Sequence, residues 1–138
     1  MCEQKEKKII QSENSPKAIG PYSPGVMACN LVFLSGQLGI DPSSGELVAG
    51  GVEAQAKQAL TNLKNLLNSN GGDLSDIVKT TIFLADIKDF SSVNEVYASF
   101  FTDSPPARST IQVAGLPKGG LVEIEAIAYL GQEYDDND

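Results

Sequence analysis

The spacing of apolar residues switches along this sequence between a helical and an extended pattern. Across residues 52–68, apolar side chains recur every three or four positions, which predicts an amphipathic helix. Asn70-Gly71-Gly72 supplies the signal for the end of that helix. The next segment, IVKTTIFLA at 77–85, is rich in β-branched residues and alternates as a strand does. One chain that contains both patterns is expected to build helices against a sheet.

The rest of the chain extends this pattern in both directions. Extended segments are predicted at 7–11, 26–29 and 31–40, a second helix after Asp89, and two closing strands at 108–113 and 121–130. With the short edge segment at 7–11 left out, the order is ββ-α-β-α-ββ, which predicts an α+β fold, with a mixed β-sheet and two helices packed on one face. We expect a single domain over residues 1–138, with flexible tails at 1–8 and 131–138.

Two helices cover only one face of such a sheet, so the other face needs a second role. In the closing strands we expect Ile111, Val113, Val122, Ile124 and Ala126 to point towards the helices. The second face then carries apolar residues together with Arg108, Thr110, Gln112, Glu123 and Glu125. A face this apolar is unfavourable in water and suits contact between subunits, so we predict a homo-oligomer with a cleft at the subunit boundary.

Arg108 has two interpretations. Its planar guanidinium can hold a small carboxylate through two parallel hydrogen bonds. It can equally form a structural salt bridge with Glu123 or Glu125. Those two carboxylates share one strand face, and they can either hold a water molecule as a base or belong to an ion network between subunits.

Other segments also have a structural and a functional interpretation. Tyr22 lies in a loop flanked by prolines, where an aromatic ring either walls a pocket or simply packs. Ser35-Gly36 interrupts an apolar strand, which indicates either a bulge or a close approach by a ligand.

The composition excludes or disfavours several classes of function. The chain has no histidine, which removes a hydrolase triad and the commonest metal ligand, and no metal cluster is visible in the sequence. Its net charge of −8 disfavours binding to nucleic-acid phosphates. We find no apolar run that would span a membrane and no secretory signal, so we expect a cytoplasmic protein.

Several motifs together resemble one known family. The run PPARSTIQVAGLPKGGLVEIEAIA is similar to the C-terminal signature of the RidA/YjgF family of reactive-intermediate (enamine/imine) deaminases. The other segments that resemble this family, in the same order and spacing, are AIGPYSPGV at 18–26, LSGQLGIDPSSGELV at 34–48, DIVKTTIFLADIKDF at 76–90 and VNEVYASFF at 93–101.

The resemblance implies a chorismate-mutase-like fold and a homotrimer whose sheets form an inner β-barrel. It implies a hydrolase acting on C=N bonds, of the 2-iminobutanoate/2-iminopropanoate deaminase type, which converts 2-imino or enamine acids such as 2-aminoacrylate into 2-oxo acids and ammonia without a cofactor. Two alternatives stay open. One is a non-catalytic module that binds small carboxylates or acts as a chaperone. The other is an endoribonuclease or translation inhibitor, which the net charge disfavours.

The resemblance also assigns roles to residues. It implies that Arg108 clamps the substrate carboxylate and that Glu123 positions the attacking water. The other cleft residues that it implies are Tyr22, Ser35, Gly36, Asn94 and Thr110. Some family members have cysteine where this chain has Thr110, so we expect its backbone rather than a thiol to matter.

Overall fold

The computed structural model describes residues 6–131 as one sheet with two long helices. Most of the two tails predicted to be flexible, 1–8 and 131–138, lies outside these residues. The strands are β1 (Lys7–Ile10), β2 (Gly25–Ala28), β3 (Leu31–Leu38), β4 (Ile77–Leu84), β5 (Ala107–Gln112) and β6 (Val122–Tyr129). The helices are α1 (Gly51–Asn68) and α2 (Phe90–Phe100), with short 3₁₀ turns at Leu74–Asp76, Ile87–Asp89 and Pro117–Gly119.

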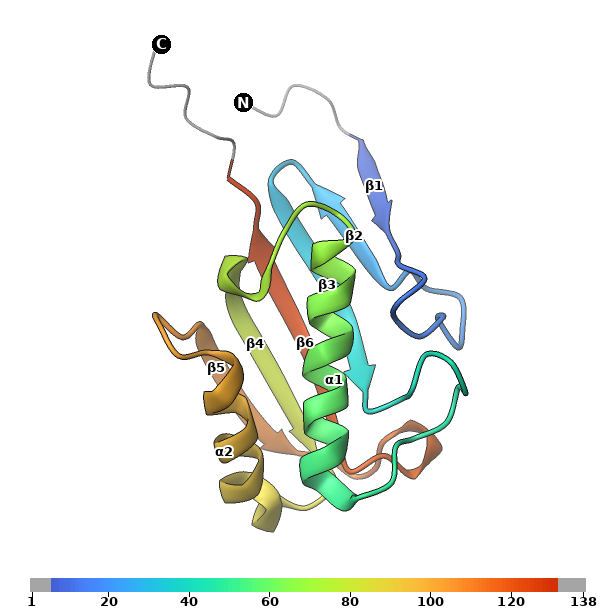
Figure 1. The fold of residues 1–138 in the computed structure, drawn as a ribbon, viewed down its shortest axis with the longest axis vertical. Helices are drawn as coiled ribbons and strands as arrows, with labels where there is room; N and C mark the ends of the chain where they lie inside the picture. The colour runs from blue at the N-terminus through green and yellow to red at the C-terminus, as the bar shows by residue number, and fades with distance from the viewer. Residues whose placement is uncertain (1–5, 132–138) are drawn as a thin grey trace.

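The sheet is mixed, as predicted. Its strand order is β1-β2-β3-β6-β4-β5, and every neighbouring pair is antiparallel except β4–β5. That parallel pair is joined by α2, because parallel neighbours need a long crossover connection. Figure 1 shows α1 and α2 side by side on the same face of the sheet. The α+β fold class is therefore confirmed, whereas the trimeric barrel stays a prediction.

The core lies between α1 and the middle of the sheet. Within α1 the predicted apolar stripe is buried, and Leu60, Leu63 and Leu66 have no exposed surface. The helix ends at the predicted signal, where the Gly72 N–H donates to the carbonyl of Leu67 (2.8 Å). The second helix is less deeply packed, and its buried residues are Val93 and Tyr97.

The face assignment for β6 is confirmed, but that for β5 is wrong. Val122, Ile124 and Ala126 are at most 3% exposed beneath the helices. By contrast Ile111 in β5 is 47% exposed on the opposite face. The parallel pairing places Arg108 beside Thr80 of β4, which is completely buried on the helix side.

Residues with the parity of Arg108, including Thr110 and Gln112, therefore project to the helix side. The pattern of the strand itself is misleading here, because the face that turns to the helices carries only polar residues, whereas Ile111 lies on the other face. The assignment that buried the most apolar side chains was the wrong one.

The second face of the sheet carries large exposed apolar side chains. Leu31, Phe33, Ile111 and Tyr129 are between 39% and 50% exposed. Within residues 6–131 no helix lies on this side (Figure 1). The described part of the chain also contains no helix long and apolar enough to cross a membrane.

Candidate functional site

Glu123 lies on the open face of β6 and rests against a glycine. A β-bulge between Leu34 and Gln37 shifts the register of β3 against β6. Gly36 lies within this bulge, and a Cβ atom there would be only 2.8 Å from Cδ of Glu123. Glycine at this position therefore lets the carboxylate of Glu123 lie where it does, because a side chain there would push it aside.

The side chain of Glu123 lines a recess that is also lined by the proline-rich loop around Tyr22. We call this the Glu123 recess; among the residues that line it are Tyr22, Gly36, Leu38, Pro117 and Glu123. Ser35 does not line it. Instead its hydroxyl donates to the carbonyl of Ser23 (2.7 Å), and its N–H donates to the carbonyl of Pro24 (2.9 Å). Ser35 thus holds the loop that presents Tyr22, a role that sequence reasoning did not distinguish from ligand contact.

The electrostatic environment makes Glu123 a better base than an ordinary glutamate. Burial raises the pKa of its carboxyl above the ordinary value, and the carboxylate of Glu125 raises the pKa further. A group whose pKa moves towards neutrality is a more effective proton acceptor at the pH of the cell.

Arg108 lies in a second recess on the helix side. Among the residues that line this Arg108 recess are Asn94, Phe101, Pro105, Pro106 and Arg108. The guanidinium carbon lies 4.8 Å from the centre of the Tyr97 ring and 5.6 Å from that of Phe90. Within residues 6–131 the guanidinium makes no ion pair and no side-chain hydrogen bond. The structural salt bridge to Glu123 or Glu125 is therefore not formed within the chain.

Thr110 follows on the same face of β5. Its hydroxyl oxygen is buried and has no hydrogen-bond partner among the described residues. As an edge strand, β5 pairs only with β4, so part of its backbone has no strand partner within the described chain. This leaves polar groups for a ligand or a second chain next to Arg108.

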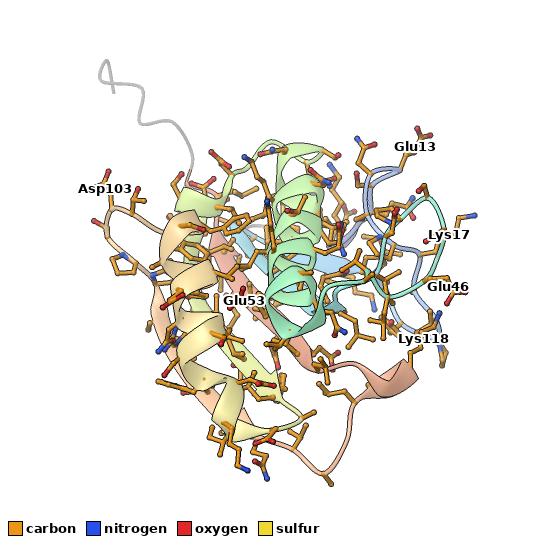
Figure 2. All side chains as sticks on the ribbon, turned by 60° about the horizontal axis from the view of Figure 1, so that its bottom comes forward. Glu13, Lys17, Glu46, Glu53, Asp103 and Lys118 are labelled. Carbon is orange, nitrogen blue, oxygen red and sulfur yellow. The ribbon has the colours of Figure 1, made fainter. Side chains whose placement is uncertain are left out.

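The two recesses lie apart within one chain. Glu123 pairs with Phe83 of β4, while Arg108 pairs with Thr80 and projects to the other side of the sheet. Figure 2 shows Lys17 and Lys118, from the loops around the Glu123 recess, at one side of the molecule. Asp103, in the loop that leads to Arg108, lies at the other side. The structure therefore groups Tyr22, Gly36 and Glu123 separately from Asn94, Arg108 and Thr110.

Two buried amides that the sequence analysis missed fix the backbone around the Glu123 recess. Asn62 of α1 donates to the carbonyls of Leu38 (3.3 Å) and Ile40 (2.9 Å), just after Gly36. Gln55 accepts from the N–H of Leu121 (2.9 Å), two residues before Glu123. The signal was present, because positions 55 and 62 fall on the apolar stripe of the helix.

Comparisons with known proteins agree on one family. A family model described as "Endoribonuclease L-PSP" matches residues 12–130. The 2-iminobutanoate/2-iminopropanoate deaminases of Bos taurus and Homo sapiens are 56% and 50% identical over 125 residues, covering 91% of this chain and 91% of each relative.

Solved structures give the same answer. The YjgF gene product of E. coli is 48% identical with a TM-score of 0.84, covering 88% of this chain and 98% of that one. E. coli TdcF with bound serine is 44% identical with a TM-score of 0.86, covering 90% of this chain and 99% of that one. The chain belongs to the RidA/YjgF family, whose model carries the ribonuclease description.

The environment of Glu123 predicts a coupled titration. Replacing Glu125 by glutamine removes a negative charge, so we expect the pKa of Glu123 to fall towards its ordinary value while burial keeps it above that value. Carbon-13 NMR of labelled glutamate carboxyls across a pH series measures this. Glu53→Gln on the exposed side of α1 is the control and should leave the Glu123 titration unchanged; an unchanged pKa in Glu125→Gln would contradict the account.

The role of Asn62 predicts a loss of stability. In Asn62→Ala the carbonyls of Leu38 and Ile40 lose their side-chain donor, so we expect the free energy of unfolding to fall by about 1–3 kcal/mol. Urea denaturation at a fixed protein concentration measures this. The control is Thr61→Ala, whose hydroxyl bonds only to the Lys57 carbonyl of its own helix. Equal stability of the two variants would rule out the bracing role.

Proposed function

We propose that this protein hydrolyses reactive 2-imino acids and their enamine tautomers to 2-oxo acids and ammonia. The relatives named as 2-iminobutanoate/2-iminopropanoate deaminases, at 50–56% identity over most of the chain, support this activity. The observation that carries the proposal is the Arg108 guanidinium, which has no protein carboxylate within the described residues. A relative that binds serine, E. coli TdcF, is consistent with a site for small amino-acid-like carboxylates.

We further propose that the complete site forms between subunits of a homotrimer. Arg108 and Glu123 lie on opposite faces of one sheet, so one small molecule cannot contact both within a chain. The exposed apolar residues of the open face, such as Phe33 and Ile111, support burial against other copies. In this arrangement Arg108, Asn94 and Thr110 of one subunit face the Glu123 recess of its neighbour.

The chemistry then needs few groups. The substrate carboxylate binds the Arg108 guanidinium through two charge-assisted hydrogen bonds, which fixes the electrophilic C2. Glu123 of the partner subunit holds a water molecule and takes its proton as the oxygen attacks C2. The same carboxyl returns this proton to nitrogen, which gives a carbinolamine. Glu123 then takes the proton of the new hydroxyl and passes it to the amino nitrogen, so the C2–N bond breaks, ammonia leaves and the C2–oxygen bond becomes the carbonyl of a 2-oxo acid.

Proximity supplies much of the rate enhancement in this scheme. An imine is already reactive, so the protein only needs to hold substrate and water in contact, an effect worth up to about 7–11 kcal/mol in well-oriented systems. No covalent nucleophile is required. A cytoplasmic location, expected from the sequence, is kept as part of this proposal.

The ribonuclease description of the family suggests a second activity to test. The net charge of −8 opposes it, because RNA cleavage requires neutralisation of the phosphate backbone. We expect that the wild-type protein and the Arg108→Ala variant, purified in parallel, both fail to cleave RNA. Cleavage lost in Arg108→Ala would favour the ribonuclease.

The clamp and base roles predict different kinetic losses. A dehydratase that generates the imine from serine or threonine in situ allows 2-oxo acid release to be followed above the uncatalysed rate. We expect Arg108→Ala to lose about 30-fold or more in kcat/KM, since truncating one partner of a buried charge pair costs about 2–5 kcal/mol. We expect Glu123→Gln to lose about 100-fold in kcat with KM little changed.

These variants also separate the enzyme from a binding module. A module that only binds carboxylates needs Arg108 but does not accelerate hydrolysis, with or without Glu123. Wild-type activity in Arg108→Ala would contradict the proposed function.

A site shared between subunits predicts complementation. Arg108→Ala and Glu123→Ala are each expected to be inactive, but mixed oligomers formed by co-expression or co-refolding contain sites with both native residues. Random assortment in a cyclic homo-oligomer gives such sites at about a quarter of the total. Activity near that level supports the shared site, whereas no recovery in mixtures shown by mass spectrometry to contain both variants would overturn it.

A further inference from the structure

The guanidinium of Arg108 is held by aromatic rings rather than by an acid. Its central carbon lies 4.8 Å from the Tyr97 ring centre and 5.6 Å from that of Phe90, both within the range of a cation–π contact. We call Tyr97 and Phe90 the aromatic platform. The rings offer no carboxylate oxygen, and within residues 6–131 no ion pair or side-chain hydrogen bond occupies the guanidinium N–H donors, so these donors stay available.

The side chain of Tyr97 is held in place by a residue of the sheet and by one at the end of its own helix. Its hydroxyl shares a 2.7 Å hydrogen bond with the hydroxyl of Thr80, which is completely buried, and Tyr97 is only 6% exposed. Its ring packs against Phe101 with centres 4.6 Å apart. Thr80 is also the β4 residue that pairs with Arg108 in the sheet. One buried residue therefore locates both the ring and the strand that carries the cation.

The platform leaves the positive charge of Arg108 intact. Burial raises the pKa of Tyr97, and the opposing influences of the Thr80 hydrogen bond and the Arg108 charge are smaller. The phenol therefore stays neutral at physiological pH. A carboxylate in the same place would neutralise the guanidinium and compete with a ligand for its donors.

We propose that the aromatic platform is the positioning device that orients Arg108 for the carboxylate of the ligand. This rests on the proposed function of Arg108 as a carboxylate clamp. Tyr97 and Phe90 act through Arg108 rather than on the reacting atoms. The platform explains how a guanidinium with no ion pair in the described chain keeps a defined direction before the ligand arrives.

The test measures binding and turnover separately. Pyruvate serves as the probe, and its Kd is measured by calorimetry for wild type, Tyr97→Leu, Tyr97→Phe and Phe90→Leu. Loss of a cation–π contact of about 0.5–2 kcal/mol corresponds to about 2–30-fold in affinity. We expect Tyr97→Leu to raise the pyruvate Kd and the substrate KM by about 5–30-fold, with a smaller change in kcat.

The conservative and control variants distinguish positioning from general packing. Tyr97→Phe keeps the ring and should retain pyruvate affinity within about threefold of wild type, even though Thr80 loses its partner. Val93→Ala, a core substitution on the same helix, should lower thermal stability but leave the pyruvate Kd unchanged. Equal losses of affinity in Val93→Ala and Tyr97→Leu would overturn the proposal.

Phe90 keeps the test decisive if Tyr97→Leu does not fold. Phe90 is 39% exposed at the start of α2, so Phe90→Leu is expected to fold and to weaken pyruvate binding about twofold to threefold. Unchanged affinity in every folded platform variant would overturn the proposal.

The Arg108→Ala variant distinguishes failure of the aromatic platform from failure of the carboxylate clamp on which it rests. If Arg108→Ala binds pyruvate as tightly as wild type, the clamp itself is wrong. If Arg108→Ala loses binding while folded Tyr97→Leu binds normally, the clamp stands and the platform is wrong.

Discussion

The alternation of side chains across the sheet is the constraint on which the rest of the structure depends. It sends Glu123 to the open face of β6 and Arg108 to the helix side of β5, so the two residues cannot meet within one chain. The same alternation buries Ile124 and Ala126 beneath the helices. The core and the separation of the two recesses therefore have one physical origin, and a shared site requires a second copy of the sheet.

In each recess, the neighbouring residues fix the position and the protonation properties of one charged side chain. Glu123 is pressed against Gly36, and its pKa is raised by burial and by the Glu125 carboxylate, which favours proton uptake. Arg108 is packed on neutral rings, which keeps its charge and its donors available. An anion and a proton-accepting carboxylate would repel each other if they met unaided. In the proposed reaction, Arg108 resolves this conflict by binding the carboxylate of the substrate while Glu123 of the partner subunit acts on the water.

Much of the fold could be predicted from the sequence, because its cues are local. The apolar stripe of α1, the glycines at 71 and 72 and the alternation in β6 each report on their own neighbourhood. The parity of β5 was not predictable in this way, since it is set by pairing with β4 through Thr80 rather than by the strand's own pattern.

The candidate site was predicted less completely. Its charged residues, Arg108 and Glu123, were visible as unusual residues in strands, and the family resemblance gave them roles. The supporting residues were missed. Asn62 is an amide on the apolar stripe of α1, but the stripe does not identify its partners, and Tyr97 occupies a position that suits ordinary core packing. Their functional meaning comes from hydrogen bonds and ring contacts between distant segments, which no local pattern records.

A crystal structure with 2-oxobutanoate, a 2-oxo acid of the type the reaction releases, tests the central claim most directly. The account predicts that the carboxylate of the ligand lies on the Arg108 guanidinium of one subunit and that its C2 atom faces the partner subunit's Glu123. An Arg108 guanidinium occupied by a protein carboxylate, with the ligand bound elsewhere, would contradict it.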